Sequence, residues 1–361
     1  MLWVDKHRPK SLDDLDCHKE VNNTLSRLVE SKDFPHLLFY GPSGAGKKTR
    51  VMSLLKAHYG DSVFHMKLEH QAVQVNESKS IEISMLSSQH HVDINPSDAG
   101  PTYDRHVVMH TVKEMAKTIP LQGNFKVVVL SEVDQLSRGA QQALRRTMEK
   151  YISKCRLILI CESTSRLIAP LRSRCLGVRV PGLEQQEMVS VLKSIATKEK
   201  IEPPPSDAYC QRICEVSQGN LRRAILTLES AKMARCNMSV ADPRTVEVPI
   251  PDWKNYCNEI ANDILTEQSP KKLYDIRQKL YELLSHCIPG DVVLREVLDH
   301  LMRSVPGPLK PRLCEQAAIY DQSLKLGAKP VIHLEAFIAQ VMATLKDGPS
   351  NALKRDAAIY V

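Results

Sequence analysis

Short apolar runs alternate with amphipathic segments along the first half of the chain. HLLFY at 36–40 stops at Gly41, and FKVVVL at 125–130 and RLILIC at 156–161 are continuously apolar. Continuous apolar runs are typical of strands that are covered on both faces of a parallel sheet. LGVRV at 176–180 is a weaker strand candidate. Because helical patterns separate these runs, the order predicts an α/β domain with a mainly parallel sheet.

The segments between these runs predict helices and a hairpin. An amphipathic pattern follows Thr49, and the composition of QQALRRTMEKY at 141–151 favours a helix. The stretch from about 63 to 95, with KLEH, SIEISM and HHVDIN, predicts a further strand and a hairpin. NPSDAGPTYDR then has the residues of a turn that leads into a helix at about 104–118.

After residue 180 the pattern becomes helical. Helices are predicted at 184–200 and 206–217 and again after SQGN, followed by the polar, proline-containing link ADPRTVEVPIPD at 241–252. The rest is helical, with breaks near Pro289-Gly290 and at 305–311. A chain of 361 residues exceeds a comfortable single core. We therefore predict a sheet domain (1–180), a small helical domain (181–240) and a C-terminal helical domain (250–361).

Composition narrows the functional classes only a little. Apolar content of 43% and charged content of 25% are ordinary for a soluble globular protein, and a net charge of +7 permits contact with nucleic acid without demonstrating it. The N-terminus has no apolar signal core, and no run approaches the ~18 apolar residues of a membrane span, so no membrane partner is expected. The ten cysteines show no metal-ligand spacing. Cys210 and Cys214 are interpreted as buried thiols of a helix, and unpaired cysteines favour a reducing compartment.

The stretch GPSGAGKKTR at 41–50 almost matches a phosphate-binding loop between a strand and a helix. Its glycines let backbone N–H groups face phosphate, and Lys47 supplies a positive charge to the outer phosphates. Lys48 stands where the pattern requires Ser or Thr, and the first hydroxyl comes one place later, at Thr49. The predicted nucleotide-binding residues of this loop are Gly41, Pro42, Ser43, Gly44, Ala45, Gly46, Lys47, Lys48 and Thr49.

A second departure lies after the strongest apolar strand. In LSEVDQ at 130–135, Ser131 stands where a nucleotide hydrolase has an Asp for Mg²⁺, and Glu132 follows as a degenerate water-polarising residue. An ammonium cannot ligate a cation, and Ser131 brings no negative charge. We expect the Lys48 ammonium to neutralise phosphate in part, in a site that holds nucleotide with little or no turnover. Two alternatives stay open: an active ATPase in which Thr49 or Ser131 restores metal support, and a scaffold with an empty site.

Several motifs follow one another along the chain: LWVDKHRP at 2–9, GPSGAGKKT at 41–49, SEVD at 131–134, ALRRTMEK at 143–150, SRC at 173–175 and GNLRRA at 219–224. In this order they closely resemble the small subunits of replication factor C, the eukaryotic sliding-clamp loader. The resemblance covers essentially the whole chain, and GKKT, SEVD and VDINPSDAG at 92–100 most resemble the subunit at the end of the five-membered arc. It implies an AAA+ module with a helical lid, followed by a collar domain that assembles the subunits.

The resemblance also implies partners and a cofactor: the other loader subunits, the sliding clamp and primer–template DNA in the nucleus, with ATP or ADP as the nucleotide. The departures at positions 48 and 131 predict that this nucleotide is held without well-ordered Mg²⁺. Arg174 of the SRC motif matches the arginine finger that reaches a neighbour's ATP, a role that suits a rigid, permanently charged guanidinium. Arg222 matches the lid arginine that senses nucleotide. Glu162 stands at the polar sensor position, where the family usually has Asn, and is a third departure from a hydrolytic site.

Two further groups are carried over from the resemblance. His7, Arg8 and Pro9 match the base-pocket segment of the family, although a packing role for the N-terminal arm is an alternative. Arg105 with Lys113, and Arg145 or Arg146, are candidates for contact with duplex phosphate, with a solvated helix face as the alternative. Adjacent helical residues diverge by about 100°, so Arg145 and Arg146 cannot face the same way, and Arg146 is the predicted contact.

Overall fold

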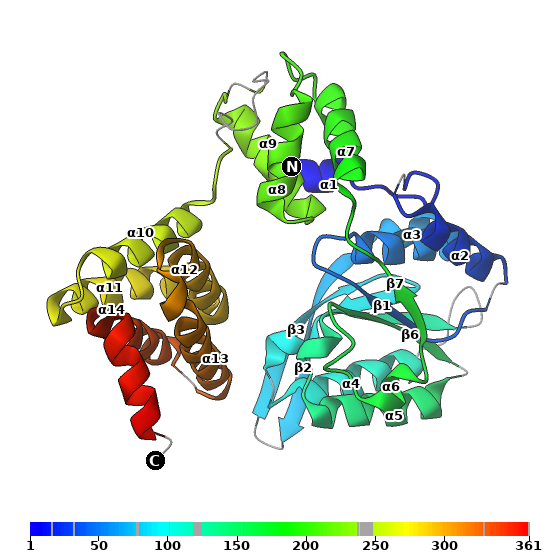
Figure 1. The fold of residues 1–361 in the computed structure, drawn as a ribbon. Coiled ribbons are helices and arrows are strands. Elements are labelled where there is room, and N and C mark those ends of the chain that lie inside the picture. Colours follow the sequence, from blue (N-terminus) through cyan, green and yellow to red (C-terminus); the bar gives the residue numbers. More distant parts are fainter. Residues whose placement is uncertain are drawn as a thin grey trace. The chain divides into compact units, whose positions relative to one another are not determined.

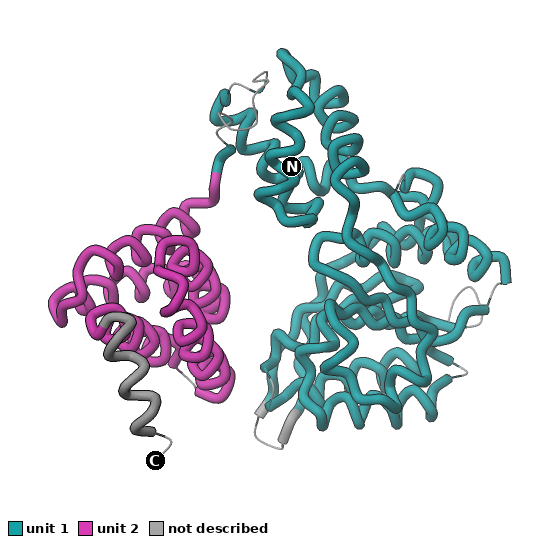
Figure 2. Tube along the Cα trace, viewed as in Figure 1, with its two compact units in different colours: residues 1–249 teal, residues 250–361 magenta. Residues whose placement is uncertain are grey.

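The computed structural model describes residues 1–15, 17–31, 33–76, 79–100, 102–117, 125–152, 154–236, 238, 248–327 and 329–359, with the side chains of residues 75, 76, 79 and 348–359 left out (Figure 1). The chain divides into two compact units, residues 1–249 and residues 250–361 (Figure 2). The finer division at residue 180 stays a prediction. Most of the predicted link at 241–252 lies outside the described residues, which resume at 248.

Unit 1 contains the sheet and the helices that cover it. The strands are β1 (Leu37–Tyr40), β2 (Lys67–Asn76), β3 (Lys79–Ser87), β4 (His91–Ile94), β5 (Lys126–Leu130), β6 (Cys155–Cys161) and β7 (Leu176–Arg179). The α-helices are α1 (Trp3–Lys6), α2 (Lys19–Glu30), α3 (Lys47–Tyr59), α4 (Asp104–Lys117), α5 (Arg138–Tyr151), α6 (Ala169–Arg172), α7 (Gln185–Lys198), α8 (Asp207–Ser217) and α9 (Leu221–Met233). Short 3-10 turns lie at η1 (Asp61–Phe64), η2 (Pro96–Ala99) and η3 (Val133–Gln135).

The strands form one sheet in the order β2-β3-β4-β5-β6-β1-β7. Strands β4, β5, β6, β1 and β7 pair in parallel, whereas β2 and β3 form an antiparallel hairpin that joins β4. The predicted α/β fold with a mainly parallel sheet is therefore confirmed, as are the hairpin and the helix that follows it. All carboxyl ends of the parallel strands lie at one edge, where the loop after β1 begins.

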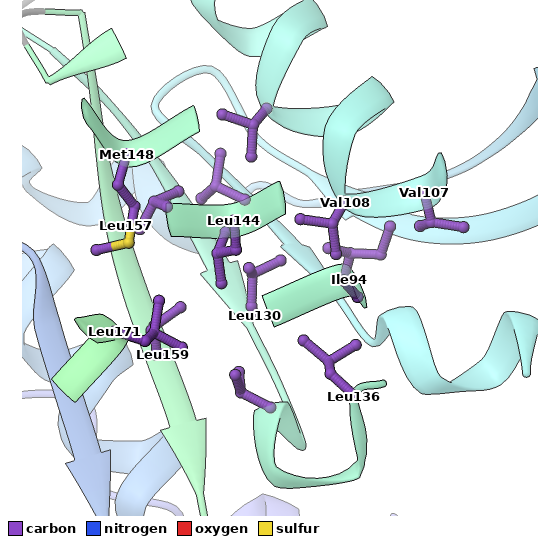
Figure 3. Close-up of a cluster of buried hydrophobic side chains, with 14 of the residues drawn as sticks. Ile94, Val107, Val108, Leu130, Leu136, Leu144, Met148, Leu157, Leu159 and Leu171 are labelled. Atoms are coloured by element: carbon purple, nitrogen blue, oxygen red, sulfur yellow. The ribbon is translucent and has the colours of Figure 1, made fainter. Parts of the chain in front are cut away.

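Alternating side chains of the central strands build a separate core on each face of the sheet. Val128 and Leu130 of β5 point into the cluster formed with α4 and α5, and Val127 and Val129 point into the cluster formed with α2 and α3. Figure 3 shows Leu130 among residues of the first cluster, near Leu144 of α5. Burial on both faces explains why these strands are apolar at every position.

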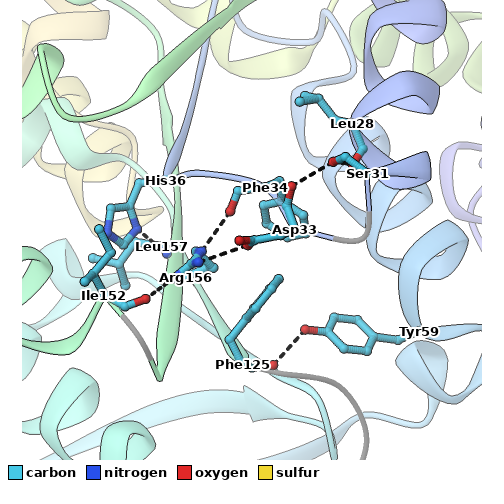
Figure 4. Close-up of polar contacts among 10 residues, drawn as sticks. All are labelled: Leu28, Ser31, Asp33, Phe34, His36, Tyr59, Phe125, Ile152, Arg156 and Leu157. Carbon is cyan, nitrogen blue, oxygen red and sulfur yellow. Dashed lines mark hydrogen bonds and ion pairs between the residues drawn. The ribbon is translucent and has the colours of Figure 1, made fainter.

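The opposite edge of the sheet is fixed by polar contacts around Arg156, at the start of β6 (Figure 4). Its guanidinium donates to the Phe34 carbonyl at 2.8 Å and to Asp33 Oδ1 at 2.9 Å, and lies 4.8 Å from the centre of the Phe125 ring. Beside it, the Leu157 N–H donates to Nδ1 of His36 at 3.0 Å. These contacts tie the residues that precede β1 to β6.

Helices α7, α8 and α9 enclose their own apolar cluster, which includes Tyr209, Leu192 and Leu228. Trp3 of α1 joins this cluster, and its backbone N–H donates to Oε2 of Glu229 of α9 at 3.1 Å. The sequence pattern predicted the three helices but gave no indication that the N-terminal residues complete their core.

Unit 2 consists of helices around a single apolar cluster that includes Ile260, Leu280 and Phe337. Its helices are α10 (Asp252–Thr266), α11 (Pro270–Ser285), α12 (Gly290–Ser304), α13 (Lys310–Leu326) and α14 (Pro330–Ile359), with the turn η4 (Gly307–Leu309). Both predicted helix breaks are confirmed. Two further boundaries, between α10 and α11 and between α13 and α14, were not predicted. Among the described residues, no helix is long and apolar enough for a membrane span.

Candidate nucleotide site and basic groove

The phosphate-loop sequence joins the end of β1 to the start of α3, as the pattern predicted. Gly46 is the N-cap of α3 at φ +84°, and Gly44 has φ +75°. A Cβ added at Gly44 would lie 1.9 Å from Oδ1 of Asn220, the residue whose side chain accepts from the Arg223 N–H and caps α9. Only glycine fits this approach, so the loop and helix α9 position each other.

Two hollows lie beside this loop and share part of their lining. The larger, about 320 Å³, is bounded by the N-terminal arm, the loop and helices α7 and α9, and the smaller, about 170 Å³, by the loop and the carboxyl ends of β5 and β6. Of the predicted nucleotide-binding residues, the larger hollow is lined by His7, Arg8, Pro9, Gly44, Ala45, Gly46, Thr49 and Arg222. The smaller is lined by Arg8, Ser43, Gly44, Gly46, Lys47, Lys48, Thr49 and Arg222, with Ser131 and Glu132. Gly41 and Pro42 belong to the loop but line neither hollow.

The linings of the two hollows suit different parts of a nucleotide. Leu15, Leu183, Val191, Ile195, Leu221 and Ile225 give the larger hollow apolar surface, which suits a base and sugar. The smaller hollow collects the cations Lys47, Lys48, Arg8 and Arg222, which suit phosphate groups. The sequence assigned these residues one by one, and the structure brings them together.

Lys47 is held by the loop itself. Its ammonium donates to the carbonyl oxygens of Gly41 at 2.6 Å and of Pro42 at 2.9 Å. Burial lowers the pKa of Lys47, while the negative charges of Glu162 and Asp134 act in the opposite direction and the Arg222 cation adds to the lowering. The ammonium therefore lies in a partly desolvated place where an anion gains from its charge.

Lys48 has a partner that the sequence prediction did not include. Its Nζ lies 2.5 Å from Oδ2 of Asp93, whose side chain is 5% exposed on β4. Ser131, at the end of β5, donates from Oγ to the other carboxylate oxygen at 3.4 Å. The ammonium that was expected to act only on phosphate is thus paired within the protein. The signal available in the sequence was an acidic residue next to the carboxyl end of a predicted strand.

Glu132 occupies a strained backbone position, with φ 54° and ψ 41°. Its carboxylate accepts a long hydrogen bond from Nδ2 of Asn95 at 3.5 Å, and its carbonyl accepts from Ser97 Oγ at 3.4 Å. The nearby Asp134 is buried and accepts from the Glu162 N–H at 3.3 Å. Glu132, Asp134 and Glu162 all line the smaller hollow, so three acidic residues border the place where phosphate would lie.

The N-terminal arm both lines the larger hollow and packs against α7. Nε2 of His7 and Nζ of Lys6 lie 2.5 Å and 2.7 Å from the same oxygen of Glu199. These hydrogen bonds, that of Lys6 first, lower the pKa of Glu199. His7, Arg8 and Pro9 thus line the larger hollow, and His7 also packs against the end of α7, while the base-pocket role stays a prediction.

Arg50, the residue after Thr49, is a buried cation that sequence analysis missed. It is 2% exposed, and its guanidinium donates to the carbonyls of Ala45 and Cys17, both at 3.0 Å, and to Asn22 Oδ1 at 3.3 Å. Its contact with Nδ1 of His18 measures 3.1 Å. Arg50 thereby fixes the phosphate loop to the segment before and within α2. In the sequence it is indistinguishable from a solvent-facing helix arginine.

Arg174 lines neither hollow and lies after α6, where its side chain is 32% exposed. It donates to the Pro170 carbonyl at 2.9 Å and forms an ion pair with Glu149 of α5. Arg145 lies 3.5 Å from the same Glu149 carboxylate. The predicted finger is therefore a partly exposed guanidinium outside this chain's own nucleotide site, next to α5.

The residues predicted to contact DNA meet in one groove between α4 and α5. Arg105, Lys113 and Arg146 line this groove of about 480 Å³, and Lys150, which sequence analysis missed, lies there as well. Buried Asp104 fixes the two helices by accepting from the Ser137 N–H at 2.6 Å. Arg146 lines the groove and Arg145 does not, as expected for adjacent residues of a helix. The groove is a concentrated positive surface, suited to an anionic polymer.

The cysteines that the structure describes are free thiols. Among the described residues, no group of three or more His, Cys, Asp or Glu side chains could hold a metal ion. Cys210 and Cys214 are buried free thiols of α8, and burial raises the pKa of each to about 11. The interpretation of this pair as core residues is confirmed.

Family models match three parts of the chain. The C-terminal domain of replication factor C subunit 3 matches residues 253–348, and the AAA+ ATPase lid domain of the RCF1/5-like family matches residues 190–233. A model of the DNA polymerase III delta subunit matches residues 17–184. In chain order, the three matches correspond to the sheet region, the helices α7–α9 and the C-terminal helical unit.

Relatives match over nearly the whole length. Replication factor C subunit 3 of Bos taurus is 47% identical over 98% of this chain and 98% of its own, and the probable subunit 3 of Dictyostelium discoideum is 44% identical over 96% and 99%. Replication factor C subunit 5 of Schizosaccharomyces pombe is 42% identical over 95% of this chain and 96% of its own. Among solved structures, Thermotoga maritima RuvB is 17% identical over 72% of this chain and 79% of its own, with a TM-score of 0.48.

Proposed function

This chain belongs to the replication factor C family, among its subunits 3 and 5, and from that premise we propose that it holds ATP or ADP with little or no hydrolysis while donating Arg174 to a neighbour's ATP. It serves in the hetero-oligomeric loader that places the sliding clamp on primer–template DNA. Because its relatives are eukaryotic replication proteins, we place it in the nucleus.

The observation that carries the weak-hydrolysis proposal is the Lys48 ammonium, 2.5 Å from Asp93, at the position where a hydroxyl would ligate Mg²⁺. Ser131 stands at the second metal-supporting position and donates to the same carboxylate. Glu162 adds a negative charge to the hollow at the sensor position. The residues present hold phosphate but do not fit a well-ordered Mg²⁺, and this supports nucleotide retention over turnover.

The position of Arg174 supports a role in trans. It lies outside both hollows of its own chain and is partly exposed, so its guanidinium is available to another subunit. A fixed cation beside the γ-phosphate stabilises charge that develops during phosphoryl transfer. The protein thus contributes a cation to a neighbour's site, although its own site lacks the usual supports for Mg²⁺.

The experiment compares Arg174→Ala with Lys47→Ala in the assembled complex, with Arg172→Ala as a matched control. We expect Arg174→Ala to reduce DNA- and clamp-stimulated ATPase, by about 10³-fold at the site it serves, while nucleotide binding by this chain persists. Lys47→Ala and Arg172→Ala should change turnover little. The reverse pattern would mean that donor and acceptor are assigned the wrong way round.

Nucleotide binding and turnover by the full chain decide between the remaining hypotheses. Retention of ADP in the presence of a chelator supports the proposed holding site. Mg²⁺-dependent hydrolysis that disappears in Lys47→Ala would show an active ATPase instead. An inability to bind either nucleotide would leave a scaffold role.

The groove between α4 and α5 is the proposed contact with duplex phosphate. Because Lys and Arg attract the DNA backbone independently of sequence, charge reversal at Arg105 and Lys113 should weaken primer–template binding most at low salt. Lys117→Glu, at the exposed end of α4 and paired with Glu114, is the matched control. Unchanged affinity of the assembled complex after reversal at Arg105 and Lys113 would exclude the groove.

A further inference from the structure

Asp93 holds the two side chains that replace the usual supports of a divalent cation. Its strand, β4, pairs with β5 so that Asp93 lies opposite Val129, two residues before Ser131. Since side chains alternate along a strand, Val129 and Ser131 share a face, and Ser131 Oγ reaches Asp93 Oδ1 at 3.4 Å. Lys48 reaches Oδ2 from the first turn of α3 at 2.5 Å. The one carboxylate thus joins positions 48 and 131 across three elements.

The charges at this point differ from those of a metal-supported site. A hydroxyl, a carboxylate and Mg²⁺ together carry one net positive charge, whereas the Lys48 ammonium and the Asp93 carboxylate carry none. Mg²⁺ requires oxygen ligands at about 2.0–2.1 Å in a near-octahedral set, and an ammonium supplies none. A divalent ion placed there would meet the Lys48 charge. The residues therefore do not accommodate the ion that the fold family implies.

We propose that the Lys48 ammonium, paired with Asp93, occupies the place of the divalent cation. We further propose that Asp93 is able to ligate a metal ion once Lys48 is replaced. This inference rests on the proposed nucleotide-holding function. Replacing Lys48 by Thr leaves two hydroxyls, one buried carboxylate and the phosphate oxygens of a bound nucleotide around one point. Such a set of oxygens is what Mg²⁺ prefers.

The test measures binding of a fluorescent ADP to the full chain, with Mg²⁺ and with a chelator. In the wild-type chain, the dissociation constant should change by less than about twofold between the two conditions. In Lys48→Thr, Mg²⁺ should tighten binding at least about tenfold. Lys48→Met, which removes the charge without adding a hydroxyl, should show no such response. Lys48→Thr combined with Asp93→Asn should lose the response.

Metal binding and folding are also measured directly, so the result does not depend on nucleotide affinity alone. Electron paramagnetic resonance of Mn²⁺ with ADP should show a bound ion in Lys48→Thr and not in the double variant. Asp93→Asn alone removes no cation, so it should stay metal-independent and bind ADP a few-fold more tightly, because Lys48 is then free to face phosphate. Thermal unfolding identifies any variant that has not folded.

The experiment tests metal-free nucleotide holding and the inference about Asp93 separately. A wild-type chain that needs Mg²⁺ for ADP would refute metal-free holding, whatever the variants do. If the wild-type chain is metal-independent and folded Lys48→Thr is as well, the inference about Asp93 fails on its own. A metal response that survives Asp93→Asn in the double variant would also overturn it, because the ion must then have other ligands.

Discussion

His36 makes the stability of the sheet domain depend on pH. Its side chain is 4% exposed just before β1, and its Nδ1 accepts the Leu157 N–H of β6 at 3.0 Å (Figure 4). Burial, and then the nearby Arg156 cation, lower the pKa of His36 from 6.5 to about 4. Protonation at Nδ1 would remove the acceptor, so the fold requires the neutral ring.

The sign and size of this pH dependence follow from the difference between the pKa of His36 in the folded and in the unfolded chain. Because the folded-state pKa lies below the unfolded value, the contribution of His36 is complete above the unfolded pKa of 6.5 and is lost as the pH falls toward 4. Between about pH 7 and pH 5 the loss is about 2 kcal/mol, since each tenfold difference in proton affinity is worth about 1.4 kcal/mol. A loss of this size is a large part of the stability of a typical domain.

The comparison is between the wild-type chain and His36→Asn, whose amide oxygen offers a non-titrating acceptor to the Leu157 N–H. Trp3 packs with α7–α9 and Trp253 lies in unit 2, so urea unfolding of the sheet domain is better followed by pulse proteolysis than by tryptophan fluorescence. The free-energy gap between the two proteins should shift by about 2 kcal/mol between about pH 7 and pH 5. His91, whose pKa burial also lowers to about 4, is present in both proteins and cancels. A shift below about 0.5 kcal/mol would refute the reasoning.

Three further substitutions probe the core, the loop support and the finger. Leu130→Ala, at a fully buried position of β5, should lower the free energy of unfolding of the sheet domain by about 2–5 kcal/mol in urea. Leu176→Ala, at an exposed position, is the control and should change this free energy little. Arg50→Met should leave the Ala45 and Cys17 carbonyls without their donor, lose about 2 kcal/mol or more and weaken ADP binding; normal ADP affinity would contradict its support of the loop. Glu149→Gln removes the ion pair of Arg174, and since an exposed pair is worth at most about 1 kcal/mol, ATPase of the complex should rise by no more than about fivefold. A loss as large as that of Arg174→Ala would show that Glu149 has another role.

The sequence could predict those features in which local pattern and burial agree. The strands β5 and β6 are apolar at nearly every position because helices cover both faces of the sheet. The phosphate loop was recognisable because its glycines are required by backbone geometry, as the approach of Gly44 to Asn220 shows. In both cases a short window of sequence contains the cause of the structure.

The missed features depend on contacts between distant residues. Asp93 meets Lys48 only because the strand order β4-β5-β6-β1 places β4 near the helix that follows β1, and strand order is not visible in a local pattern. Arg50 follows the motif as an ordinary basic residue, yet the segment of Cys17 folds over it and buries it. The positive φ of Glu132 is likewise a product of its surroundings, since nothing in a glutamate favours that conformation.

Helix α5 connects the proposed sites of this protein. Arg146 lines the basic groove, and Glu149, three residues further along the same helix, pairs with both Arg145 and Arg174. Residues three apart lie close on a helix, so a ligand that pulls on Arg146 acts within one turn of the residue that holds the finger. We therefore expect binding in the groove to act on the Glu149–Arg174 ion pair through charges on one helix, and not through this chain's own nucleotide site.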